Sequence, residues 1–148
     1  MMNREQIINE LKKYFNISEL VCNHTYGVWG ERGWVFLDTK LLHTLLIVRR
    51  DILNVGIYVN TATLTQRGLR CNICQLVKDK TKKKSLYLSA HIFGKAIDFH
   101  TKELGASQCR AKIIEKQSLL PYNIRLEKDV TWVHLDVMPF SNNKIYIF

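Results

Sequence analysis

The sequence has little proline and no long apolar run. Of its 148 residues only 2 are proline and 7 are glycine, and it contains no internal repeat. No stretch of about 18 apolar residues is present, so we expect no membrane insertion. Without a proline-rich or glycine-rich linker, the sequence predicts a single domain over residues 1–148.

A secretory signal is also missing. The first 15 residues are charged and helical in pattern, and they lack an apolar block followed by a small-residue cleavage site. We therefore expect a chain made in the cytoplasm. If it acts at a bacterial cell wall, a pore or a viral particle must deliver it there.

The charge is strongly positive. Hydrophobic residues make up 47% of the chain and charged residues 24%, which is enough apolar material for a core, and the formal net charge is +9. Much of the excess comes from a lysine-rich segment at residues 78–84, which is most simply a solvated loop. The charge favours polyanionic surroundings, including nucleic acid or an anionic cell wall. No nucleic-acid-binding motif accompanies it, so no specific nucleic-acid partner is predicted.

The four cysteines do not complete a metal motif in the sequence. Cys71 and Cys74 form a C-x-x-C pair, but such a pair needs a second pair of ligands to indicate zinc. Cys22 and Cys109 are isolated and do not supply it. We expect four reduced thiols, most of them buried.

Hydrophobic periodicity predicts helices before strands. Asp38 is a plausible N-cap for the second helix, and Gly94 marks a turn. The expected helices span residues 3–15, 39–53 and 105–119. The expected strands span residues 57–60, 86–88, 96–100, 123–126, 131–137 and 145–148, with irregular chain at 22–34 and 61–84. This order favours an α+β fold with a small antiparallel sheet and flanking helices.

One short segment carries two candidate metal ligands. His91 and Asp98 offer an imidazole nitrogen and a carboxylate oxygen, both of which bind zinc. Seven positions apart, they cannot face one another along a straight strand. A turn at Gly94 would let the chain double back, and the small Ala96 would allow close packing beside a metal.

A second segment carries the third candidate ligand. On a strand, alternate side chains share a face, so Trp132, His134 and Asp136 would line one face and aliphatic residues the other. His134 would complete a set of three protein ligands. Three ligands leave one coordination position open for water, as hydrolytic zinc requires.

These two segments together resemble a known family. The pattern Ser89-x-His91-x-x-Gly94-x-Ala96-x-Asp98, followed later by a Trp-x-His-x-Asp strand, resembles the metallopeptidases that include D-alanyl-D-alanine carboxypeptidases and L-alanyl-D-glutamate endolysins. The hedgehog signalling domain is similar to them in fold. The resemblance covers roughly residues 15–140. It implies an α+β fold around a small antiparallel sheet and one Zn²⁺.

The resemblance also implies substrate-binding groups. The family often has an arginine before the first motif that binds a substrate carboxylate or carbonyl, and Arg67 and Arg70 both occupy that region, with Arg70 the preferred candidate. Ser89 would either hydrogen-bond near the metal or shape the turn. Trp132 would line the substrate side of the site.

The sequence departs from the family at the general base. Many members have a glutamate three residues before the last histidine ligand, where this chain has Thr131. Asp136 would act as the base or orient His134, and Glu127 is a weaker candidate for the base.

The resemblance implies an enzyme that hydrolyses peptide bonds in peptidoglycan, as a carboxypeptidase or an endopeptidase. The small size is similar to that of a phage lysis enzyme or a virion-associated peptidase, whose partners would include virion proteins. A non-catalytic cell-wall-binding or virion structural module is the alternative. The bond cut, the general base and the oligomeric state stay open.

Overall fold

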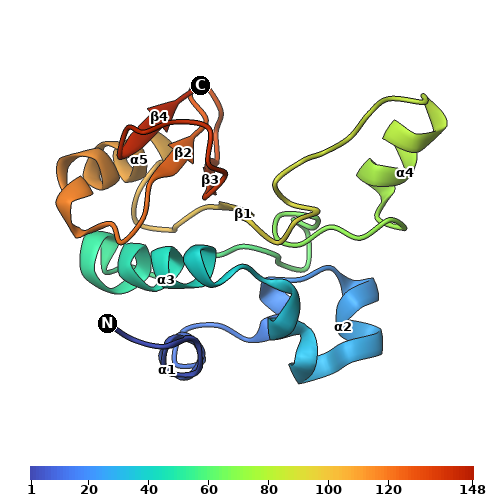
Figure 1. Ribbon diagram of the computed structural model, residues 1–148, viewed down its shortest axis with the longest axis horizontal. Coiled ribbons are helices and arrows are strands. Elements are labelled where there is room, and N and C mark those ends of the chain that lie inside the picture. Colours follow the sequence, from blue (N-terminus) through green and yellow to red (C-terminus); the bar gives the residue numbers. More distant parts are fainter.

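The chain forms five α-helices and four short β-strands, an α+β fold (Figure 1). The computed structural model describes residues 1–148. The helices are α1 (Arg4–Leu11), α2 (Asn23–Trp29), α3 (Thr39–Ile47), α4 (Gln75–Lys82) and α5 (Ala106–Glu115). The strands are β1 (Ala96–Phe99), β2 (Ile124–Leu126), β3 (Val133–Asp136) and β4 (Ile145–Ile147). None of the helices combines the length and the hydrophobicity that a membrane crossing requires.

The sheet is mixed, with the strand order β1-β3-β2-β4. β3 pairs antiparallel with both β1 and β2, whereas β4 pairs parallel with β2. The expectation of an antiparallel sheet was therefore wrong for this last pair. After β3 the chain reverses and passes β2 to reach its outer edge, so β4 runs in the same direction as β2.

Helix α3 lies at the centre of the molecule, between the N-terminal helices and the sheet (Figure 1). The predicted N-cap at Asp38 is confirmed. The carboxylate of Asp38 accepts a hydrogen bond from the backbone N–H of Lys40 at 2.7 Å. The helix continues without a break into one π-helical segment, Val48–Leu53. Its leucines are buried in the core together with the aliphatic face of β3.

Two helices and two strands differ from the expected elements. The expected loops at residues 22–34 and 61–84 contain α2 and α4, neither of which has a buried residue. Because no residue of either helix is buried, neither contributes a face to the core, which is the feature on which helix prediction rests. No strand forms at residues 86–88, where Leu86 is 86% exposed, and residues 57–60 contribute only a bridge between Tyr58 and His100.

The turn expected at Gly94 is present and leaves no room for a side chain. Gly94 has a φ of +65°, and a Cβ atom there would lie 2.0 Å from the backbone oxygen of Phe36. The backbone N–H of Lys95 donates to the oxygen of Ala90 at 2.9 Å, which closes the turn. The chain therefore doubles back just before β1, so that the residues before the turn lie against the strand.

Replacing Gly94 should destabilise the protein. Gly94→Ala forces an alanine to a positive φ and against backbone atoms, so we expect the free energy of unfolding to fall by about 2 kcal/mol or more. Gly27→Ala is the matched control, because Gly27 lies within α2 and no atom lies within 4 Å of its added Cβ. That variant should be as stable as the parent or up to about 1 kcal/mol more stable in urea unfolding. Equal stability of the two variants would contradict the role given to the turn.

Candidate metal centre

The pairing of β1 with β3 places two of the three predicted ligands together. Asp98 and His134 stand directly opposite one another in the register. Opposite residues of an antiparallel pair point to the same face of the sheet. The Nδ1 of His134 consequently lies 2.8 Å from the Oδ1 of Asp98.

The turn at Gly94 brings the third predicted ligand to the same point. The Nε2 of His91 lies 3.2 Å from the Oδ2 of Asp98. The other ring nitrogen, Nδ1, lies 2.9 Å from the backbone oxygen of Gly68. Because a carbonyl oxygen only accepts, Nδ1 carries a proton, so Nε2 is the nitrogen that would be available to a metal.

These donor atoms fit a metal ion. One ligand atom from each of His91, Asp98 and His134 lies within 4.8 Å of the others. Two imidazoles and a carboxylate are ligands that zinc accepts, so the chemistry of the set agrees with the Zn²⁺ that the resemblance implies. All three residues are buried, and the Asp98 and His134 side chains each keep 11% of their surface exposed.

Asp136 holds the far side of the His134 ring. Its Oδ2 lies 2.7 Å from the Nε2 of His134. Its Oδ1 accepts hydrogen bonds from the Nε of Arg125 at 2.8 Å and from the backbone N–H of Met138 at 3.0 Å. Asp136 is fully buried. Both of its oxygens are therefore occupied, and neither faces solvent.

The three charged groups shift one another's pKa. Burial opposes the charge on His134, but hydrogen bonds to Asp136 and Asp98 outweigh it and raise its pKa to about 9. Burial also opposes the charge on Asp98, yet hydrogen bonds from His134 and His91 hold its pKa well below the usual range. The pKa of Asp136 is lowered in the same way, against its burial, by hydrogen bonds from His134 and Arg125. A metal cation at this point would be attracted by the same two carboxylates.

Of the two candidate arginines, Arg70 reaches the centre directly. Its Nη2 lies 3.3 Å from the Oδ2 of Asp98, and its Nη1 donates to the hydroxyl of Tyr87 at 2.6 Å. The side chain of Arg67 instead contacts the Nδ1 of His100 at 3.1 Å. The geometry therefore favours Arg70, the candidate that was also preferred from the sequence.

Ser89 and Glu127 each form a hydrogen bond with the backbone of a candidate ligand, whereas Trp132 contacts Arg110. The Oγ of Ser89 accepts a hydrogen bond from the backbone N–H of His91 at 3.3 Å, so this residue shapes the turn. Trp132 lies just before β3, and its backbone oxygen accepts from Arg110. Glu127 follows β2 and donates its backbone N–H to the oxygen of His134 at 3.4 Å, which places it opposite His134.

Several contributors were missed in the sequence. Gly68 contacts His91 through its carbonyl oxygen, so no side-chain pattern could mark it. Its position requires a glycine, because a Cβ there would lie 2.1 Å from the backbone oxygen of Leu20. Tyr87 lies in a stretch expected to be a strand. Arg125 could have been found, because a hairpin of the two predicted strands places it opposite Asp136.

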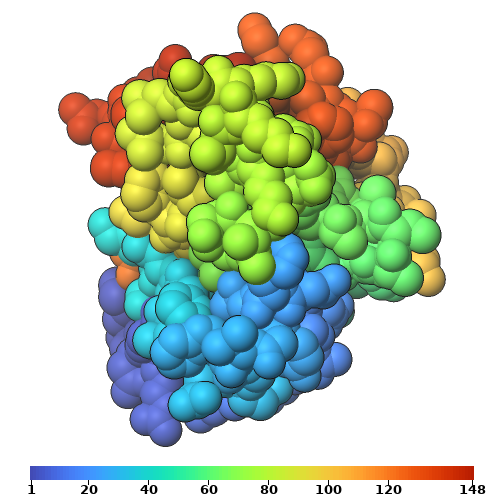
Figure 2. Space-filling view, turned by 90° about the vertical axis from the view of Figure 1, so that its right-hand side faces the viewer, coloured from blue at the N-terminus to red at the C-terminus, as the bar shows by residue number.

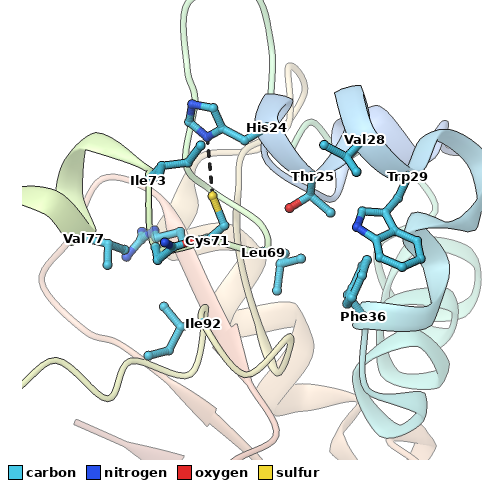
Figure 3. Close-up of a pocket in the computed structure, with 12 residues that line it drawn as sticks. His24, Thr25, Val28, Trp29, Phe36, Leu69, Cys71, Ile73, Val77 and Ile92 are labelled. Carbon is cyan, nitrogen blue, oxygen red and sulfur yellow. Dashed lines mark hydrogen bonds between the residues drawn. The ribbon is translucent and has the colours of Figure 1, made fainter.

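An apolar cavity of about 550 Å³ is lined by residues that neighbour the centre, although none of the three candidate ligands is on its wall (Figure 3). Arg70 and Ile92, the neighbour of His91, are on its wall. Across the cavity the rings of Trp29 and Phe36 pack edge to face, with centroids 5.1 Å apart. Arg70 thus contacts the candidate ligand Asp98 on one side and lines an open apolar space on the other.

A second group of metal-binding side chains is present. One donor atom from each of Cys22, His24, Cys71 and Cys74 lies within 4.8 Å of the others. The expectation that Cys22 is isolated from the C-x-x-C pair was therefore wrong. Cys22 and the C-x-x-C pair are far apart in sequence, and only tertiary structure brings them together. All four cysteines are free thiols, as predicted.

Comparison with known proteins gives no match, whether to a family model, to a curated protein or to a solved structure.

Changing Asp136 should weaken metal binding at this centre. In Asp136→Asn the partner of His134 loses its charge, so zinc affinity should fall by about 10- to 100-fold. Asp129→Asn is the control, since Asp129 is exposed and has a positive φ that asparagine accepts. Zinc content measured over a series of buffered free-zinc concentrations should show one binding event shifted in Asp136→Asn and none in Asp129→Asn. An unshifted curve for Asp136→Asn would contradict the assignment.

Proposed function

We propose that the chain is a zinc-dependent peptidase that hydrolyses peptide bonds in the stem or cross-link peptides of peptidoglycan. The observation that carries this proposal is the meeting of the donor atoms of His91, Asp98 and His134, which Arg70 links to an apolar cavity. The resemblance of both sequence segments to peptidoglycan metallopeptidases supports the substrate class.

His91, Asp98 and His134 would hold the metal through Nε2, a carboxylate oxygen and Nδ1. A zinc ion bound by three protein ligands polarises a scissile carbonyl and lowers the pKa of a bound water towards about 7. The backbone oxygen of Gly68 fixes the tautomer of His91 for this role. Asp136 does the same for His134, because its Oδ2 accepts the proton of Nε2 and leaves Nδ1 for the metal.

Glu127 is the better candidate for the general base. Asp136 has both oxygens engaged and no exposure, so it is poorly placed to take a proton from water. Glu127 stands opposite His134, two residues after Arg125, which stands opposite Asp136. Alternate residues share a face, so we place the Glu127 side chain on the face of the sheet that carries Arg125, His134 and Asp136. It is also half-buried rather than sealed. This arrangement would supply the carboxylate that Thr131 does not.

Arg70 would bind an oxygen of the substrate. It is held by the backbone oxygen of Gln66, by Tyr87 and by Asp98, so its guanidinium is fixed at the edge of the cavity. A stem peptide carries carboxylates that a guanidinium binds well. The net charge of +9 would add a salt-sensitive attraction to an anionic wall.

A role in phage lysis or in a virion is the biological setting we propose for this activity. It rests on the resemblance to endolysins. In this setting the enzyme reaches the wall through a pore or as part of a particle, with virion proteins as partners in the latter case.

The zinc-loaded protein should release soluble peptides or new amino groups from purified peptidoglycan. A chelator should stop the release, and His134→Ala should abolish it together with the zinc at this centre. His43→Gln is the control, because His43 packs near Tyr122 and belongs to neither metal group. Mass spectrometry of fragments from defined muropeptides would identify the bond. Binding to sacculi without any release would contradict the enzyme and favour a non-catalytic wall-binding module.

Glu127→Gln should separate catalysis from metal binding. Loss of a general base lowers the rate by about 10²- to 10⁴-fold. We expect a loss of this size in kcat with zinc content and thermal stability unchanged, whereas Glu115→Gln, an exposed change on α5, should have no effect. Full activity in Glu127→Gln, with the loss appearing in zinc-loaded Asp136→Asn, would assign the base to Asp136 instead.

A further inference from the structure

Cys22, His24, Cys71 and Cys74 form a compact group that the proposed peptidase does not use. The Sγ atoms of Cys71 and Cys74 are 3.8 Å apart. The Nδ1 of His24 lies 3.5 Å from the Sγ of Cys71 and 3.8 Å from that of Cys74. Figure 3 shows His24 above Cys71, joined by one of these contacts. The thiol of Cys22 completes the group within 4.8 Å.

These separations are those of a tetrahedral zinc site. Zinc–sulfur bonds of about 2.3 Å and zinc–nitrogen bonds of about 2.0 Å give sulfur–sulfur edges of about 3.8 Å and sulfur–nitrogen edges of about 3.5 Å. The three measured distances agree with those edges to within a few tenths of an ångström. A disulfide between Cys71 and Cys74 would instead need their sulfurs about 2.05 Å apart.

The four ligands also indicate a structural rather than a catalytic zinc site. Three thiolates and one imidazole suit zinc, and no carboxylate belongs to the group. Four protein ligands fill the tetrahedron and leave no position for water or substrate, which is the arrangement of structural zinc. The backbone N–H of Cys71 donates to the Sγ of Cys74 at 3.4 Å, an outer hydrogen bond of the kind that steadies a metal-bound thiolate.

The chain around Cys71 needs such a support. Between residues 60 and 90 only Gly68, Leu69, Cys74 and Ala90 are buried, so this stretch contributes little to the core. Figure 2 shows the face where the light-blue residues of α2 lie directly below the lime-green chain around α4. Beyond Leu69, which pairs with Val21, apolar burial gives this junction little stability.

We propose that Cys22, His24, Cys71 and Cys74 bind a structural zinc ion that ties the start of α2 to the start of α4. The ion closes the junction that the bridge between Val21 and Leu69 begins. It also steadies the loop in which Gly68 accepts the hydrogen bond of His91. This site takes no part in the proposed peptidase chemistry, because its ligands are different residues and all four of its positions are filled by protein.

The test counts zinc in the full chain after the other centre has been removed. His91→Ala/His134→Ala protein, purified under reducing conditions with limiting zinc, should keep one zinc per chain. X-ray absorption should show sulfur ligands at about 2.3 Å and one nitrogen ligand. Adding Cys71→Ser/Cys74→Ser should remove this zinc, whereas adding Cys109→Ala, at a buried thiol outside the group, should not.

Zinc-free His91→Ala/His134→Ala protein, zinc without sulfur ligands, or a Cys71–Cys74 disulfide that excludes metal would overturn the proposal. If the serine variants fail to fold, X-ray absorption of the otherwise unchanged chain decides, because sulfur ligands must then appear in its zinc spectrum. Failure to digest peptidoglycan leaves this outcome unchanged, so the two proposals fail separately.

Discussion

The antiparallel register between β1 and β3 is the constraint on which the candidate metal centre depends. It sets Asp98 directly opposite His134, and a slip of one residue in the register would put the two side chains on opposite faces of the sheet. The turn at Gly94 then adds His91, because it folds the preceding chain back onto the strand. Two features of the backbone, the register of one strand pair and one turn, therefore bring these three side chains together.

Both imidazole rings of this centre contact a fixed partner through the nitrogen that does not face a metal. Gly68 fixes one imidazole through a backbone oxygen, and Asp136 fixes the other through a carboxylate that Arg125 neutralises. Such partners limit rotation of the rings and set which nitrogen faces the metal. The same arrangement explains why Asp136 is poorly placed as a base, since its oxygens are already engaged.

Features that depend on local patterning could be predicted from the sequence. The cap at Asp38, the turn at Gly94 and the alternation of His134 and Asp136 with aliphatic residues each depend on residues a few positions apart, and the structure agrees with all three. The parallel pairing of β4 with β2 depends on which edge of the sheet is free. The group around Cys71 depends on tertiary contacts with α2, and no spacing rule within one segment reveals such a group.

Both groups of metal-binding residues involve the loop that runs from residue 66 to residue 74. One end of the loop supplies Gly68 and Arg70 to the candidate catalytic centre, and the other supplies Cys71 and Cys74. This loop buries few side chains, so packing alone constrains it weakly. A structural ion at its far end would limit the movement of the residues that hold His91.

Anomalous diffraction at the zinc edge from crystals of the zinc-loaded chain tests the central claim most directly. We expect a strong peak bounded by the Nε2 of His91, a carboxylate oxygen of Asp98 and the Nδ1 of His134, with a fourth side open to the solvent. An absence of signal at that point, with the Asp98 carboxylate still hydrogen-bonded to the Nδ1 of His134 in excess zinc, would contradict it.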